Sequence, residues 1–211
     1  MMENYKKIGP GHLFQNHVTG PLPDYSSNYS KSRYDTYSTN DAMSKLRFMV
    51  LEDNIGNFKS VLDFGYGNGA FMRYCQKFGK TVYGYDISDY PVPDGCQKVE
   101  TANDVEVDVI TFFDSLEHIV VEHLCTGLEL LKTKYVCISV PWYHEERGEE
   151  WFQNWKHRRE NEHFHHFDSH GLVALLNKAG YKVIRLSNVE DKVRTPVDHL
   201  PNILTVIAQK I

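Results

Sequence analysis

Three glycines and two aspartates between positions 63 and 86 have the types and spacing for nucleotide chemistry. Gly65, Gly67 and Gly69 stand at alternate positions, and glycine lets the backbone turn sharply with no Cβ in the way of a ligand. An acid, Asp63, stands two positions before the first glycine. A second acid, Asp86, follows seventeen positions after Gly69, where a carboxylate can accept hydrogen bonds from ribose hydroxyls. The pattern predicts a nucleotide-binding turn.

This turn needs a strand before it and a helix after it. Residues 59–64 form a short apolar run typical of a buried strand, and residues 71–75 begin a helical run. Residues 81–85 form a second strand that ends at Asp86. Strand, glycine turn, helix, strand and acid make up the first half of a nucleotide-binding α/β fold.

Asp63 distinguishes between two cofactors that suit this pattern. Gly65, Gly67 and Ala70 also match the dinucleotide fingerprint, in which the helix N-terminus faces a pyrophosphate. A carboxylate close to that turn would repel a pyrophosphate but would attract a ligand with an ammonium and a sulfonium. The sequence therefore favours the sulfonium cofactor, and an NAD-dependent oxidoreductase is kept as an alternative. A tight strand-to-helix turn that binds no ligand is the remaining alternative, and the acids at both expected positions argue against it.

Residues 61–69 resemble the first motif of the class I methyltransferases that use S-adenosylmethionine (SAM), in particular their small-molecule branch, which includes quinone-biosynthesis enzymes. That motif, two apolar residues and then Asp-x-Gly-x-Gly-x-Gly, is complete here. The apolar run 108–113, followed by Asp-Ser-Leu-Glu-His at 114–118, resembles the motif of their fourth strand. The resemblance implies SAM as the cofactor. The cofactor-binding residues that we predict are Asp63, Gly65, Tyr66, Gly67, Gly69, Asp86, Ile87, Asn103, Asp114 and Ser115.

The resemblance covers residues 45–211 and implies a Rossmann-like α/β sandwich. Its sheet has seven strands, mostly parallel, with an antiparallel last strand. Pro91 and Pro93 prevent a full helix between residues 87 and 95, so we predict a reduced second crossover. The later elements that we predict are a helix with leucines at 124, 128 and 131, a strand at 135–140, a helix at 171–179, and closing strands at 181–186 and 203–208.

Residues 1–44 form the other predicted unit, an aromatic N-terminal cap or tail. Residues 1–40 are polar and turn-rich without strand or helix periodicity, and the first twenty suit a flexible tail equally well. Tyrosines recur at positions 25, 29, 34 and 37. The resemblance implies that this aromatic segment closes over the cofactor.

Residues 142–166 form an insert that is unlike the framework. It contains all three tryptophans, Trp142, Trp151 and Trp155, among many charged residues. A charged helix packed on the edge of the domain is one interpretation. The other is an aromatic lid beside the methyl donor, because loops after strand ends determine specificity. We predict that the acceptor is enclosed between this insert and residues 25–37.

Methyl transfer from a sulfonium is an in-line displacement in which the donor already has its leaving group. The protein must mainly align the reacting atoms and exclude water, and a general base helps only when the nucleophile is protonated. The catalytic candidates are His118, His166 and Tyr34, and His165 is a further candidate.

Two groups of residues raise the question of a metal. Six of the eleven histidines fall between positions 144 and 170, but the spacing of His163, His165 and His166 suits no single strand face or helix turn. Asp114, Glu117 and His118 resemble the acidic motif with which some quinone-biosynthesis O-methyltransferases hold a divalent cation, although those enzymes have Glu at the first position. We predict no bound metal and an activity that is indifferent to chelators.

The amino-acid composition limits the kinds of partner and compartment that we expect for this protein. A formal net charge of −5 disfavours a broad nucleic-acid footprint, and no apolar run is long enough to span a membrane. The four cysteines have no Cys-x-x-Cys spacing, so neither zinc nor a disulfide framework is indicated, and a reducing cytoplasm is the expected compartment. We predict a monomer or homodimer that methylates a small molecule at O, N or C. A SAM- or SAH-binding protein that transfers no methyl group is the alternative from another class (SAH, S-adenosylhomocysteine).

Overall fold

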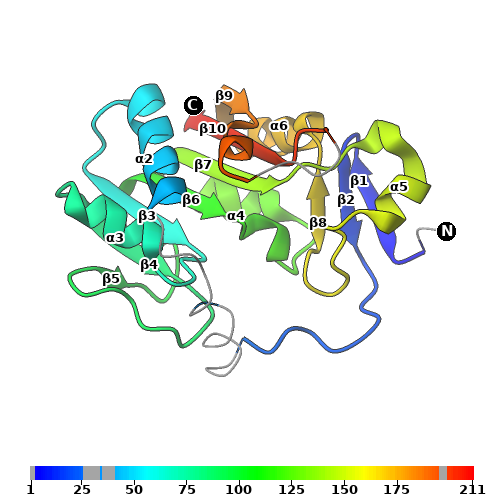
Figure 1. The fold of residues 1–211 in the computed structure, drawn as a ribbon, viewed down its shortest axis with the longest axis horizontal. Coiled ribbons are helices and arrows are strands. Elements are labelled where there is room, and N and C mark those ends of the chain that lie inside the picture. The colour runs from blue at the N-terminus through cyan, green and yellow to red at the C-terminus, as the bar shows by residue number, and fades with distance from the viewer. Residues whose placement is uncertain (1–2, 26–33, 35–40, 195–198) are drawn as a thin grey trace.

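The computed structural model describes residues 3–25, 34, 41–194 and 199–211. Two sheets organise them, one of seven strands in the order β5-β4-β3-β6-β7-β10-β9 and one of three strands in the order β1-β2-β8 (Figure 1). None of the described helices combines the length and the apolar character needed to cross a membrane.

The seven-stranded sheet has the predicted topology. Strands β3 to β7 pair in parallel, whereas β10 lies antiparallel between β7 and β9, as a class I methyltransferase sandwich requires. The strands are β3 (Ser60–Phe64), β4 (Thr81–Tyr85), β5 (Gln97–Lys98), β6 (Val107–Phe113), β7 (Thr133–Pro141), β9 (Tyr181–Ser187) and β10 (Ile203–Lys210). The predicted fold class is confirmed.

Helices cover both faces of this sheet because its strands are apolar on both sides. Leu62 and Ile110 face a core that includes buried leucines of α4 and α6, whereas Val61 and Val109 face the core beneath α2 and α3. Neighbouring residues of one strand thus pack on opposite faces. The helices are α2 (Ala42–Ile55), α3 (Ala70–Lys77), α4 (Leu124–Leu130), α5 (Gly148–Asn154) and α6 (Ser169–Lys178), with 3₁₀ turns η1 (Leu116–His118), η2 (Glu145–Arg147) and η3 (Val189–Lys192).

The second crossover is reduced, as the prolines predict. Between Asp86 and Cys96 the chain forms bends and turns with no helix, and β5 has only two residues. This short connection leaves the carboxyl end of β4 uncovered by a helix.

The first twenty residues differ from the prediction, because they contain two strands. Strands β1 (Tyr5–Gly9) and β2 (His12–Gln15) pair antiparallel, and β2 also pairs with β8 (His165–Phe167), as the adjacent blue and yellow arrows in Figure 1 show. All four residues of β2 are buried. An alternating pattern is absent because this central strand is covered on both faces.

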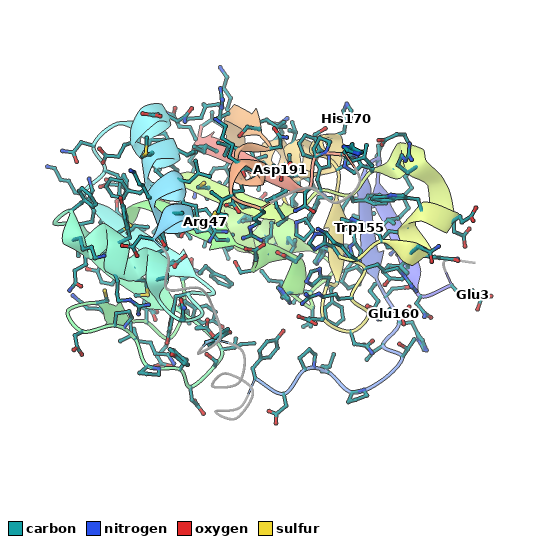
Figure 2. The ribbon with its side chains drawn as sticks, viewed as in Figure 1. Glu3, Arg47, Trp155, Glu160, His170 and Asp191 are labelled. Atoms are coloured by element: carbon teal, nitrogen blue, oxygen red, sulfur yellow. The ribbon has the colours of Figure 1, made fainter. Side chains whose placement is uncertain are left out.

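The insert also differs from the predicted lid. Its helix α5 contributes Phe152, which packs with Trp155, Tyr143 and Leu13 in a small core of its own. In Figure 2, Trp155 lies beside the three-stranded sheet, away from α2. The aromatic residues of the insert therefore join β1 and β2 to the main domain.

Candidate functional site

A cavity of about 1020 Å³ lies at the carboxyl ends of β3, β4 and β6. Strand β3 lies between β4 and β6 in the sheet. The chain runs outward from β3 to β4 and β5 and then crosses to β6 on the other side of β3. Ligands of open α/β sheets bind where the strand order reverses in this way. The cavity therefore occupies the place where the fold itself predicts a ligand.

The glycine turn forms one wall of this cavity. Gly65, Gly67 and Gly69 all have positive φ angles, of 79°, 54° and 71°. A Cβ on Gly65 would lie 2.6 Å from the Cβ of Ser115, so only glycine keeps the space between these two segments open. The turn fits a cofactor that lies close to the backbone.

Asp86 fixes the shape of the turn. Its Oδ2 accepts a hydrogen bond from the amide of Gly67 at 2.9 Å, and its Oδ1 accepts one from the amide of Ser88 at 2.8 Å. The residue borders the cavity, and each carboxylate oxygen has a second lone pair for a ligand hydroxyl. Asp86 can therefore hold both the turn and a ribose.

Asp63 lies at the same edge of the sheet. It is 3% exposed, and its Oδ1 accepts a hydrogen bond from the hydroxyl of Thr111 at 2.8 Å. Burial raises the pKa of this carboxyl to about 6, because the hydrogen bond and the charge of Arg47 offset only part of the desolvation. A cationic ligand in the cavity would stabilise the ionised form. The position suits an ammonium or a sulfonium.

Asp114 also borders the cavity, but two arginines already bind its carboxylate. Arg194 Nη1 donates to its Oδ1 at 2.9 Å, a second guanidinium nitrogen of Arg194 donates to Oδ2, and Arg47 Nη2 donates at 3.1 Å. Burial alone would raise the pKa of Asp114, but the two guanidinium groups hold it well below its usual range. Its charge is neutralised within the protein.

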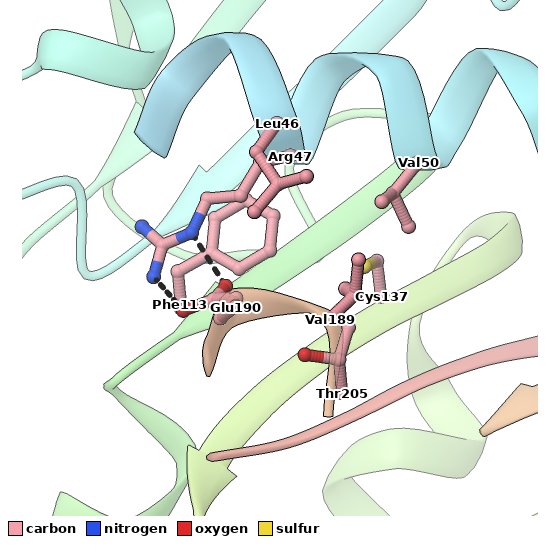
Figure 3. A pocket seen from close by; sticks show the side chains of 8 residues that line it. All are labelled: Leu46, Arg47, Val50, Phe113, Cys137, Val189, Glu190 and Thr205. Carbon is pink, nitrogen blue, oxygen red and sulfur yellow. Dashed lines mark hydrogen bonds and ion pairs between the residues drawn. The ribbon is translucent and has the colours of Figure 1, made fainter. Parts of the chain in front are cut away.

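Glu190 completes this ionic network beneath α2. It is 1% exposed and accepts hydrogen bonds from Arg47 at 2.7 and 3.0 Å. Figure 3 shows the guanidinium of Arg47 directed at Glu190. The guanidinium carbon of Arg47 lies 4.1 Å from the centre of the Phe113 ring. Local sequence patterns do not identify Arg47, Glu190 and Arg194 as buried, because charged residues on amphipathic segments usually face solvent.

Eight of the ten predicted cofactor-binding residues border the cavity. The two exceptions are Gly69 and Asn103. Gly69 begins α3 behind the turn, and a Cβ there would lie 2.4 Å from Pro93. Asn103 is half-buried in a turn between β5 and β6, and its Oδ1 has no hydrogen-bond partner among the described residues. The structure therefore does not place Asn103 where a cofactor contact was predicted.

The structure separates the catalytic candidates. His118 and Tyr34 border the cavity, whereas His166 does not. His166 is buried between aromatic rings, with ring centres of Phe152 at 5.0 Å and Trp155 at 5.8 Å. Burial lowers the pKa of His166 to about 3. His166 therefore lies away from the cavity that its predicted catalytic role requires, and so does His165, whose ring hydrogen-bonds the ring of His12 at 2.9 Å.

The wall of the cavity opposite the glycine turn comes from residues 157–164, whereas the sequence predicted that tryptophans of the insert would form it. Residues 157–164 border the cavity through five polar side chains and Phe164, whereas the three tryptophans do not. Gln15 fixes this segment, because its Nε2 donates to Asn161 Oδ1 and its Oε1 accepts from the Asn161 amide, both at 2.8 Å. The structure therefore does not place the tryptophans where the predicted lid requires them. Of the predicted tyrosine segment, Tyr25 and Tyr34 border the cavity, and Tyr29 and Tyr37 lie outside the described residues.

Glu117, His118 and His163 meet within the cavity wall. One ligand atom of each lies within 4.8 Å of the others. Burial raises the pKa of Glu117, with a further contribution from the charge of Asp114, and burial lowers the pKa values of His118 and His163. The sequence places His163 in a histidine cluster but gives no sign that it pairs with His118, which is forty-five residues away. Such a group can hold a cation or move a proton.

Comparison with known proteins agrees with this geometry. A family model described as "Methyltransferase domain" matches residues 34–186. No curated protein matches the chain in sequence. These findings place most of the chain within one family model.

Solved structures share the fold at low sequence identity. The Burkholderia thailandensis 1,6-didemethyltoxoflavin-N1-methyltransferase, solved with 1,6-didemethyltoxoflavin and S-adenosylhomocysteine, has a TM-score of 0.64 and 18% identity over 98% of this chain and 99% of that chain. A SAM-dependent methyltransferase from Archaeoglobus fulgidus has a TM-score of 0.60 and 18% identity over 85% of this chain and 97% of that chain. Human N-acetylserotonin methyltransferase, solved with SAM, has a TM-score of 0.61 and 16% identity over 86% of this chain and 55% of that chain.

Proposed function

Because the chain belongs to the methyltransferase domain family, we propose that it transfers a methyl group from SAM to a small-molecule acceptor. The observation that supports this most strongly is the cavity at the ends of β3, β4 and β6. The glycine turn and the carboxylates of Asp63 and Asp86 border it on one side, and residues 157–164 border it on the other.

The size of the cavity supports two ligands. Its volume is about 1020 Å³, at the upper end of the roughly 300–1000 Å³ range of small-molecule sites. SAM supplies an activated methyl group when bound. Asp86 would accept from the ribose hydroxyls and Asp63 would attract the ammonium, while the wall at residues 157–164 orients the acceptor and excludes water.

Tyr25 and His118 favour a polar acceptor on the side away from the glycine turn. The Tyr25 hydroxyl lies 3.5 Å from His118 Nδ1, and both residues border the cavity. Burial lowers the pKa of His118, so its imidazole is neutral near pH 7 and can act on an acceptor hydroxyl or amine. We assign His118 to the acceptor and Asp63 and Asp86 to SAM.

Residues 1–44 would act as a cap through Tyr25, and residues 157–164 would replace the tryptophans as the other enclosing segment. Hydrogen exchange with and without SAH and acceptor tests this revised enclosure. Peptides within 157–164 should gain protection, whereas α5, which packs in its own core, should not change. Protection of α5 alone would contradict the assignment.

The net charge and the free cysteines support two further assignments, the class of the acceptor and the cellular compartment. A net charge of −5 favours a small molecule over a nucleic acid as the acceptor. All four cysteines are free, which agrees with a reducing compartment such as the cytoplasm.

The experiment that tests the proposed function is a screen of small hydroxyl, amine and activated-carbon acceptors, read out as SAH formation. Asp86→Ala serves as a control variant in which SAM binding should be weakened. SAH that appears only with the wild-type protein and an acceptor would support the proposal. Binding of SAM without SAH formation from any acceptor would favour the non-catalytic alternative, and failure to bind SAM would contradict the proposal.

A further inference from the structure

We propose that Glu117, His118 and His163 form a binding site for a divalent transition-metal ion in the wall of the cavity. All three residues border the cavity, and one ligand atom of each lies within 4.8 Å of the other two. Two imidazoles and one carboxylate are a common donor set for such ions, and they leave further coordination positions open. The site is separate from the glycine turn and from Asp63 and Asp86.

Unpartnered polar atoms are the first observation that supports the site. Glu117 is 1% exposed, and neither of its carboxylate oxygens has a hydrogen-bond partner among the described residues. His163 is also buried, and within the same part of the chain its Nδ1 has no partner. Buried polar atoms are almost always paired, and a buried carboxylate without a partner is costly. A cation between these atoms would satisfy the carboxylate and an imidazole together.

The spacing of the ligand atoms is the second observation. Three atoms that are at most 4.8 Å apart surround a point no more than about 2.8 Å from each. Metal–ligand bonds to nitrogen and oxygen are about 2.0–2.2 Å for zinc and reach about 2.6 Å for larger ions. Small side-chain movements would therefore bring all three atoms to bonding distance.

The backbone keeps these three residues together across a long sequence separation. The amide of Phe164, next to His163, donates to the carbonyl of Glu117 at 2.7 Å. The rings of His118 and His163 are 4.6 Å apart and nearly perpendicular. The ligands thus come from η1 and from the segment before β8, and this backbone hydrogen bond joins the two segments.

This ligand set differs from the one that the sequence motif suggested. Asp114 is bound by Arg47 and Arg194, so its carboxylate is not free for an ion. His163 takes its place, from a part of the chain that the motif does not include. The inference reverses the expectation of no metal.

The role of the ion rests on the proposed function, although its binding does not. Bound beside the acceptor, the ion would polarise a hydroxyl and lower its pKa, as metal ions do for water. His118 would then act on the acceptor as a ligand of the ion and not as a free base.

Titration of the chelator-stripped full chain with Co²⁺ tests the site. We expect one equivalent to bind, with a visible absorption spectrum of histidine coordination that Zn²⁺ abolishes. Glu117→Gln and His163→Gln should each weaken Co²⁺ binding by about 100-fold or more. The matched controls are His123→Gln and His170→Gln, since both histidines are exposed, as Figure 2 shows for His170, and they should bind like the wild type.

The outcomes separate the site from the proposed function. SAH binding by each variant verifies that it is folded. The metal site is overturned if the wild-type protein binds no Co²⁺, or if Glu117→Gln and His163→Gln bind it as tightly as the controls. Methyl transfer by a protein that binds no Co²⁺ would overturn only the metal site. Co²⁺ binding by a protein that fails to bind SAM would support the site and contradict the proposed function.

Discussion

The two sides of the cavity are assembled in different ways. The side with the glycine turn comes from one continuous stretch, β3 to the end of β4, and its contacts use mainly backbone amides, as in the bond from Gly67 to Asp86. The opposite side joins Tyr25, His118 and residues 157–164, which are far apart in sequence. There the contacts use side chains, as between Gln15 and Asn161.

This difference explains how one fold can serve many acceptors. A backbone turn depends on glycines and hardly changes with the side chains around it. A wall of side chains held by long-range pairs can change residue by residue without affecting the sheet. If the comparison is correct, changes on one side should alter SAM binding, and changes on the other should alter the use of the acceptor.

The largest effect is expected from Gly65→Ala on the cofactor side. Its φ of 79° disfavours any Cβ, and the added atom would lie 2.6 Å from Ser115. We expect SAH binding to be lost and the free energy of unfolding to fall by about 2–4 kcal/mol. Calorimetry and urea denaturation measure the two effects.

Gly127→Ala is the matched control for this change. Gly127 lies within α4, and no atom lies within 4 Å of an added Cβ. The variant should bind SAH normally and gain up to about 1 kcal/mol of stability. Normal SAH binding by Gly65→Ala would refute the account of the turn.

A smaller effect is expected from Asp86→Ala. The change removes a carboxylate that holds the amides of Gly67 and Ser88 and would hold the ribose. SAM affinity should fall by about 1–3 kcal/mol, as measured by calorimetry. An affinity within twofold of the wild-type value would show that the acid is not a cofactor contact.

Asn161→Ala tests the acceptor side. Its side chain accepts hydrogen bonds from Gln15 Nε2 at 2.8 Å and from the amide of Thr19 at 3.0 Å, and Gln15 is 1% exposed. Leaving a buried donor unpaired should cost about 1–3 kcal/mol of stability. The KM for the acceptor should rise about tenfold in steady-state assays, while SAM affinity stays within twofold.

Asn161→Asp is the control, because it keeps an oxygen at the accepting position and tolerates the positive φ of 63°. It should behave like the wild type. If Asn161→Ala weakened SAM as strongly as Asp86→Ala does, the two sides of the cavity would not be independent.

The smallest effect is a pH dependence of SAM binding that arises from Asp63. Burial raises the pKa of Asp63 to about 6, so its carboxylate is charged above that pH and protonated below it. Because the charged form attracts a cation, SAM affinity should be constant above pH 7 and fall about tenfold by pH 5. Calorimetry at several pH values measures this, and Asp63→Asn should abolish the dependence. An unchanged pH profile in Asp63→Asn would assign the titration to another group.

The same contrast determines what the sequence could predict. The glycine turn, Asp63 and Asp86 were predictable because strand, turn and acid are neighbours in the chain. Strand β2 was not, because His12–Gln15 lacks alternation and its partner β8 lies about 150 residues away. Composition identified an aromatic insert at 142–166, but it could not show that Phe152 and Trp155 pack inward.

Ionic and histidine pairs were also beyond local pattern analysis. Arg47 lies in α2, and its partners Asp114 and Glu190 are 67 and 143 residues away. His118 and His163 are also distant in sequence, and they meet where the amide of Phe164 donates to the carbonyl of Glu117. Such contacts depend on where distant segments of the chain come together at the cavity. The whole fold determines this arrangement, and local periodicity in the sequence does not reveal it.

Calorimetry with SAM, SAH and NAD tests the central claim most directly, because it asks which cofactor the glycine turn and its two acids accept. We predict that SAM and SAH each bind at one site per chain and that NAD does not bind, since Asp63 would repel a pyrophosphate. Asp86→Ala should weaken SAM and SAH alike. Tight binding of NAD with no binding of SAM would contradict the account.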